Sequence, residues 1–131
     1  MHLISRETDY AVRALCYLAR YPRAIVPVVL LCSESRTPRS YLRRILQTLA
    51  KAGILDSFRG KGGGFRLRKS VSGIRLADVM EIFQGHPDFT RCGFRNRVCP
   101  RRSTCPLRVK IKEIEQRAVA ELRAITIAAL V

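Results

Sequence analysis

Acidic residues are scarce in this sequence. The 131 residues include 10 Asp and Glu against 25 Lys and Arg, so the formal net charge is +15 at pH 7. A positive charge this large on so small a chain favours a polyanionic partner, with nucleic acid ahead of a membrane surface. Charge alone leaves a second possibility, a ribosome-like or merely soluble basic protein.

Long hydrophobic runs are also missing. No apolar stretch approaches the roughly 20 residues that a helix needs to cross a bilayer, so we expect no membrane partner. The start of the chain lacks the continuous apolar core of a secretion signal, because Arg6, Glu7 and Asp9 interrupt it. We therefore expect a cytoplasmic protein, with one hydrophobic core and an appendage that needs a partner to be buried.

The motifs of common enzymes are absent as well. The sequence holds no nucleophile–base pair and no dinucleotide fingerprint. Its glycine-rich segment, residues 60–64, lacks the strand–turn–helix context of a phosphate-binding loop. We expect that the chain is not an enzyme.

What the sequence has instead is a concentrated block of basic residues. Ten Lys and Arg lie between Arg36 and Lys69, where Asp56 is the only acid. Charge of one sign that is grouped in this way predicts a surface patch and not a mixed, solvated surface.

Hydrophobic spacing predicts three helices in the first half of the chain. Residues 7–20 and 41–49 carry apolar side chains at helical spacing, and the short apolar stretch 26–35 predicts a helix between them. Thr37 and Pro38 are typical of a helix start, a capping hydroxyl followed by proline at the first helical position. The middle helix is expected to have an unusually apolar surface.

A β-hairpin and two further helices are predicted next. Residues 54–58 and 65–68 alternate apolar and polar side chains around a glycine-rich turn, which predicts a hairpin with a basic tip. Residues 74–83 predict a fourth helix. Residues 107–125 carry apolar side chains at intervals of three and four, with charged residues such as Glu115 between them. A long helix with so narrow an apolar seam packs against a second copy of itself or folds back on its own domain.

Three helices followed by a glycine-tipped basic hairpin predict a winged helix-turn-helix. The fold class is then mainly α, with a small β-hairpin wing and a long C-terminal dimerisation helix. We divide the chain into a DNA-binding domain (1–85), a cysteine segment (86–106), and a dimerisation helix with a C-terminal tail (107–131).

The third helix and the wing supply the candidate DNA-binding residues. In this fold the N-terminal residues of the third helix reach the base edges in the major groove of double-stranded DNA, and the wing lies beside the backbone or in the minor groove. Arginine makes the bidentate contact to guanine, while Ser and Tyr contact phosphates or bases. The candidates are Arg39, Ser40, Tyr41, Arg43 and Arg44 in the helix, and Arg59 and Lys61 in the wing.

Three of the five cysteines cluster in an arginine-rich segment. Six residues separate Cys92 from Cys99, and five separate Cys99 from Cys105. Iron–sulfur clusters are held mainly by cysteine thiolates, and zinc also accepts them. Structural zinc sites prefer cysteine pairs roughly two to four residues apart, so the wider spacing favours an iron–sulfur cluster. Zinc and three unligated thiols are the alternatives. The other two, Cys16 and Cys32, lie alone in apolar stretches and are typical of small core residues.

Three cysteines leave a fourth ligand position open. An oxygen or nitrogen ligand, weaker than a thiolate, would leave a cluster accessible to small molecules. From the residue types alone the candidates are Asp9, Glu7, His2 and His86.

Four parts of the sequence, in this order, resemble the bacterial IscR/NsrR family of transcription regulators. They are TDYAVRAL at residues 8–15, PRSYLRRIL at 38–46, RGKGGGF at 59–65 and the three-cysteine segment. The resemblance covers essentially the whole chain. It implies a homodimer joined by the long helix, with a 2Fe–2S or 4Fe–4S cluster near the dimer interface.

The resemblance also bears on the fourth ligand. In nitric-oxide-sensing members an acidic residue at the Asp9 position of the partner subunit completes the site, and in iron–sulfur-assembly regulators a histidine beyond the third cysteine does so. No histidine follows Cys105 here, so Asp9 is the preferred ligand and Glu7 its neighbouring alternative.

The expected function is that of a DNA-binding regulator, a repressor before an activator. An iron–sulfur cluster would gate it in response to nitric oxide, redox state or iron–sulfur status. The alternative is a zinc- or thiol-dependent DNA-binding module without redox gating.

Overall fold

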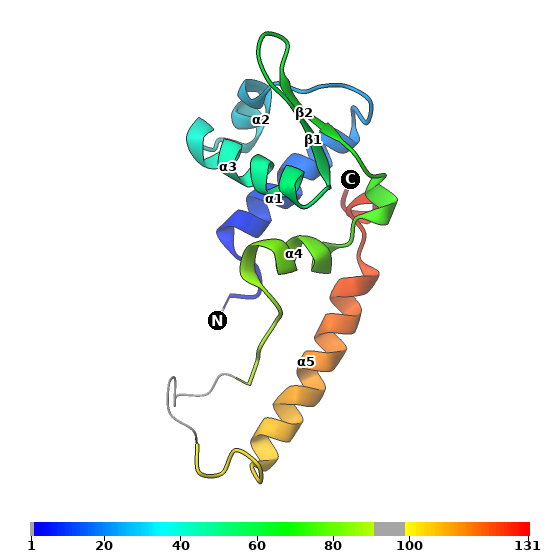
Figure 1. Ribbon diagram of the computed structural model, residues 1–131. Helices are drawn as coiled ribbons and strands as arrows, with labels where there is room; N and C mark the ends of the chain where they lie inside the picture. The colour runs from blue at the N-terminus through cyan, green and yellow to red at the C-terminus, as the bar shows by residue number, and fades with distance from the viewer. Residues whose placement is uncertain (1, 91–98) are drawn as a thin grey trace.

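The computed structural model describes residues 2–90 and 99–131 of the chain, so the predicted ligand Cys92 lies outside the described residues. The described part contains helices and one β-hairpin (Figure 1). The elements are α1 (Arg6–Ala19), α2 (Val28–Ser35), α3 (Arg39–Lys51), β1 (Leu55–Phe58), β2 (Gly64–Leu67), η1 (Val71–Gly73), α4 (Leu76–Gln84), α5 (Pro106–Ala124) and η2 (Ile127–Leu130).

Helices α1, α2 and α3 share one hydrophobic core with the hairpin. α1 begins after Ser5, whose side-chain oxygen accepts the backbone N–H of Thr8. Its apolar face includes Leu15, and the inner face of α3 includes Leu42 and Leu46; all three are fully buried. Because apolar residues recur every three or four positions in both helices, each helix buries one face and exposes the other. The burial of one face of α3 therefore decides which of its side chains reach solvent.

The hairpin is held to the helices through the backbone at its base. The N–H of Val26 donates to the Phe65 carbonyl at 2.9 Å, and the N–H of Phe65 donates to the Val26 carbonyl at 3.0 Å. Glycine is needed at the neighbouring position, because a Cβ on Gly64 would lie 2.2 Å from the Val26 carbonyl oxygen. These bonds fix the wing beside the start of α2.

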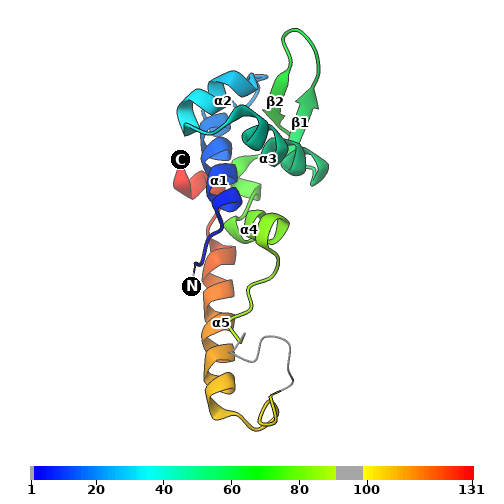
Figure 2. The same cartoon turned by 90° about the vertical axis from the view of Figure 1, so that its left-hand side faces the viewer.

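Helix α5 brings the chain back to the winged part, because its N-terminal end lies far from the other helices and its C-terminal end lies beside them. Figure 2 shows α5 extending away from the other helices, with its C-terminal end beside them. Ile127 in η2 is fully buried, and its N–H donates to the Ile74 carbonyl at 2.8 Å. The N–H of Leu76 donates to the Ile125 carbonyl at 2.9 Å. The residues after α5 thus complete the core of the winged part.

The predicted fold class, mainly α with a small hairpin wing and a long C-terminal helix, is confirmed. The middle helix forms, and Val29 and Leu30 on it are half-exposed, so its surface is as apolar as expected. Among the described residues no helix is long and apolar enough to cross a membrane.

The predicted cap of the third helix is wrong. α3 begins at Arg39 after Pro38, and no side chain caps it. Thr37 is buried, and its hydroxyl donates to the Ser35 carbonyl at 3.2 Å. Since Pro38 is extended, with φ −54° and ψ 135°, it takes the capping position itself. Thr37 then stands one residue too early to accept the N–H groups of the first turn.

Candidate nucleic-acid interface and cysteine segment

A groove lies between α3 and the wing. It has a volume of about 740 Å³, and its lining includes Arg39 and Arg43 from α3 and Arg59 from the hairpin. Val28 and Val29 of α2 contribute apolar side chains to the same groove. Three of the predicted DNA-binding residues, from two separate elements, are therefore brought around one concave surface.

The spacing of residues along α3 explains why this surface is basic. Arg39, Arg43, Gln47 and Lys51 follow one another at intervals of four, so they lie on one face of the helix. The opposite face is buried in the core. Gln47 and Lys51 also line the groove, although neither is among the DNA-binding residues predicted from the sequence. The interval of four was the signal that could have identified them.

The other predicted residues of α3 lie outside the lining of this groove. The Tyr41 ring packs edge-on against Tyr10, with 5.8 Å between ring centroids. The Arg44 guanidinium lies over the Tyr41 ring, 5.5 Å from its centroid. Ser40 is exposed beside them. These contacts connect the first turns of α3 to α1.

The basic residues of the wing differ in whether they are paired with an acidic residue. Asp56 accepts hydrogen bonds from Arg68 at 2.9 Å and from Arg66 at 3.3 Å, and the Arg68 hydrogen bond is the main cause that lowers the pKa of Asp56. Arg59 and Lys61, at the tip, are exposed and make no ion pair with another described residue. The tip residues are thus available to an external anion, while Arg66 and Arg68 are partly neutralised by Asp56.

The cysteines fall into two groups. Cys16 and Cys32 pack against the core, and burial raises the pKa of the Cys16 thiol, as expected for core residues. Cys99 and Cys105 are half-buried free thiols at the two ends of a turn, and Cys105 is the residue that precedes α5. In residues 2–90 and 99–131 no three His, Cys, Asp or Glu side chains form a group able to hold a metal ion.

Asp9 lies in the first turn of α1 and is half-exposed. Its carboxylate forms an ion pair with Arg13, one turn further along the helix, at 3.0 Å. Within one subunit the structure does not bring Asp9 together with Cys99 and Cys105 as a metal-binding group of the described residues.

Gln84, the last residue of α4, fixes the start of α1. Its side-chain carbonyl accepts the N–H of Ser5 at 2.8 Å and the hydroxyl of the fully buried Thr8 at 2.9 Å. Its amide donates to the Leu3 carbonyl at 2.9 Å. One side chain thus holds the region that carries Asp9 against the helix that leads to the cysteine segment.

Glu115 has a comparable role on α5. The sequence pattern puts it between the apolar residues of the helix, and the structure buries it: the residue is 2 % exposed. Its carboxylate accepts the N–H of Phe89 at 2.7 Å and also pairs with Lys112. The hydrogen bond from Lys112, and then that from Phe89, lowers the pKa of Glu115. The segment that leads to the cysteines is therefore anchored to the middle of α5.

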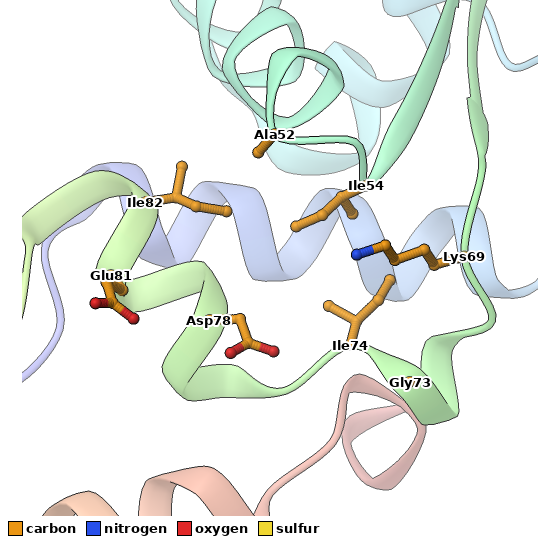
Figure 3. A pocket seen from close by; sticks show the side chains of 8 residues that line it. All are labelled: Ala52, Ile54, Lys69, Gly73, Ile74, Asp78, Glu81 and Ile82. Atoms are coloured by element: carbon orange, nitrogen blue, oxygen red, sulfur yellow. The ribbon is translucent and has the colours of Figure 1, made fainter.

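A second cavity lies away from all predicted site residues. Its volume is about 420 Å³, and Ile54, Ile74 and Ile82 form its apolar walls (Figure 3). Lys69 and Asp78 supply charged groups at its edge.

Comparison with known proteins identifies a family. The family model described as Rrf2, iron-dependent transcriptional regulator, matches residues 4–131. The chain is 28% identical over 111 residues to Protein aau3 of Rhizobium meliloti (strain 1021), over 84% of this chain and 72% of that protein.

Solved structures with similar folds include two named regulators. T. potens IscR matches with a TM-score of 0.77 and 21% identity, over 98% of this chain and 85% of that one. CymR, described as the global cysteine regulator of B. subtilis, matches with a TM-score of 0.80 and 20% identity, over 99% and 96% of the two chains. At these identities the similarity concerns the fold.

Proposed function

This chain belongs to the Rrf2 family of iron-dependent transcriptional regulators, and from that premise we propose that it is a homodimeric repressor whose binding to promoter DNA is gated by an iron–sulfur cluster. Rrf2-family membership makes it a transcriptional regulator. We propose, beyond this, the homodimer, the DNA-contact residues, the cluster and the role as a repressor.

The groove between α3 and the wing is the observation that carries the DNA-binding part. Arg39 and Arg43 stand at the end of α3 that enters the major groove in a helix-turn-helix complex. Arg59 stands across the groove, at the tip of the wing. Cations from both elements can therefore contact one duplex together, the helix at base edges and phosphates and the wing at the backbone.

The exposed apolar side chains of α5 support the homodimer. Leu107 and Ile114 are 68% and 50% exposed, and Ile111 is half-buried. These residues recur at the intervals that bring them to one side of the helix. Leu122, near the end of the helix, is buried. The apolar residues in the N-terminal half of α5 are thus exposed and can pack against a second copy of the chain, whereas Leu122 in its C-terminal half is already buried.

The donor chemistry of the cysteine segment fits an iron–sulfur cluster. We propose that Cys92, Cys99 and Cys105 hold it and that Asp9 of the partner subunit completes the site. Thiolate sulfur is the usual ligand of such clusters, and the half-buried thiols of Cys99 and Cys105 carry no disulfide. A bound cluster would make the site sensitive to nitric oxide, oxygen and the availability of iron, because each of these can alter or remove it.

Two side chains give the cysteine segment a route to the DNA-binding face. Glu115 ties Phe89 to α5, and Gln84 ties the end of α4 to the start of α1. α1 contacts α3 through Tyr10 and Tyr41. A displacement of the cysteine segment can therefore shift both the dimer helix and α3, which would change the separation of the two recognition helices.

Anaerobic purification tests the proposal. We expect a coloured protein that contains iron and sulfide and binds a promoter fragment with an affinity that changes after nitric oxide or oxygen is added. The Cys92→Ala variant should lack the colour and fail to respond. Equal DNA affinity of the loaded wild type and this variant would refute gating and leave DNA binding intact.

The rival function is a zinc- or thiol-dependent DNA-binding module. The fold similarity to CymR, described as a global cysteine regulator, keeps this rival in consideration. Metal analysis separates the two, because zinc without iron or sulfide favours the rival. Asp9→Ala gives a second test: the variant should lose an iron–sulfur cluster faster than the wild type does, whereas it should retain zinc as well as the wild type if the rival is correct.

A further inference from the structure

Arg36 occupies the turn between α2 and α3 in a backbone conformation that suits glycine. Its φ is 51° and its ψ is 41°, and it is the only residue other than glycine with a positive φ in the described part of the chain. A side chain is strained in this left-handed region, so glycine is the usual residue after a helix that ends in this way. The turn is closed by the Arg36 N–H, which donates to the Cys32 carbonyl, and any residue but proline could supply that N–H.

Within the described residues the Arg36 side chain makes no polar contact that would offset this strain. It is exposed, and it forms no hydrogen bond or ion pair with another residue that the structure describes. Residues held in strained backbone conformations cluster at functional positions.

The position of the turn suggests what that function is. Arg36 stands three residues before Arg39, the first residue of α3. In helix-turn-helix binding, the helix before the recognition helix crosses the phosphate backbone while the recognition helix enters the groove. The residue that joins the two helices therefore lies over the phosphates beside the groove. The guanidinium of arginine matches phosphate oxygens with two parallel hydrogen bonds.

We propose that Arg36 binds a DNA phosphate beside the major groove, and that this contact explains an arginine where glycine would fold with less strain. The inference rests on the proposed DNA-binding function and adds a residue from outside the groove and the wing. A phosphate contact reads no base, so its loss should weaken binding to every DNA sequence alike.

Two substitutions separate the charge from the strain. Arg36→Gln keeps a strained side chain and removes the charge, whereas Arg36→Gly removes both. Arg117→Gln is the matched control, because it removes one exposed charge from α5. Binding is measured over a range of salt concentrations, on a labelled duplex of random sequence and on a duplex that the wild type selects from a random pool.

Both Arg36 variants are expected to bind both duplexes about tenfold more weakly. The slope of log K against log salt should become shallower by about 2, since the dimer loses one phosphate contact per subunit. Arg117→Gln should bind as the wild type does. In thermal unfolding, Arg36→Gly should melt above the wild type and Arg36→Gln at the same temperature.

Three outcomes would overturn the inference. Unchanged affinity and slope in Arg36→Gln would show that no phosphate is bound. A lower melting temperature for Arg36→Gly would assign the arginine to the negative end of the α2 dipole instead. Failure of the wild type to bind either duplex would refute the DNA-binding function together with the role of Arg36.

Discussion

The close approach of Gly64 to Val26 yields a prediction whose size can be worked out. In Gly64→Ala, the new Cβ would lie 2.2 Å from the Val26 carbonyl oxygen and 2.6 Å from its carbon. Both are backbone atoms, so no side-chain rotation relieves the overlap. The backbone at Gly64, with φ +154°, is also unfavourable for alanine.

Relief of the overlap requires the hairpin to separate from the segment before α2. Two backbone hydrogen bonds between Val26 and Phe65 are then lost, at about 1 kcal/mol each. The unfavourable backbone conformation adds about 1 to 3 kcal/mol. The total, about 3 to 5 kcal/mol, is a large part of the roughly 5 to 15 kcal/mol that stabilises a typical domain. At about 4 °C for each kcal/mol, the melting temperature should fall by roughly 12 to 20 °C.

Thermal unfolding followed by circular dichroism measures this loss, at one fixed protein concentration because dimers gain stability with concentration. Gly73→Ala is the matched control, since its Cβ would meet nothing within 4 Å and its φ is not in the glycine region. That variant should lie within about 0.5 kcal/mol of the wild type. A Gly64→Ala protein that melts within about 3 °C of the wild type would refute the described contact between wing and helix segment.

Three further predictions concern the links between elements. Gln84→Leu removes three hydrogen bonds to the start of α1 and should cost about 2 to 4 kcal/mol in urea unfolding; equal stability would show that these bonds are not formed. The pKa of Glu115 is lowered by the hydrogen bond from Lys112 and then by that from Phe89. The contribution of its carboxylate to the free energy of unfolding is therefore complete above the ordinary pKa of 4.5, and it is lost as the pH falls through the lowered pKa. The difference in melting temperature between wild type and Glu115→Gln should therefore shrink on acidification, and a constant difference would contradict the assigned cause. Ile127→Ala should destabilise the winged part by about 2 to 5 kcal/mol, as read from urea unfolding, and a neutral effect would contradict its burial.

The sequence predicted the regular elements well because their signals are local. The periodic apolar residues of α1 and α3 and the glycines of the wing each act over a few residues, and the observed bounds differ little from the expected ones. Arg39, Arg43 and Arg59 could be predicted because they lie in elements with such local signals, and the structure brings all three to one groove. The cap on α3 failed because Pro38 adopts an extended conformation and shifts the start of the helix by one residue.

The connections between elements could not be predicted, because they depend on residues far apart in the chain. Nothing near Gln84 indicates that its side chain binds residues about 80 positions earlier. Glu115 follows the pattern of a solvent-facing residue, and only the N–H of Phe89 and the Lys112 side chain make its burial favourable. A charged group in a periodic pattern is assigned to solvent unless its partner is known.

The return of the chain from α5 to the winged part has a consequence for how this protein is made. Ile127 fills the core between α1 and η1, and the Ile125 carbonyl binds the N–H of Leu76. A ribosome that has released only the first 85 residues has therefore produced α3 and the wing without the segment that completes their core. We therefore expect the winged part to become stable only after residues 125–127 have been made. A chain cut short before η2 should therefore not hold α3 and the wing in the arrangement described above.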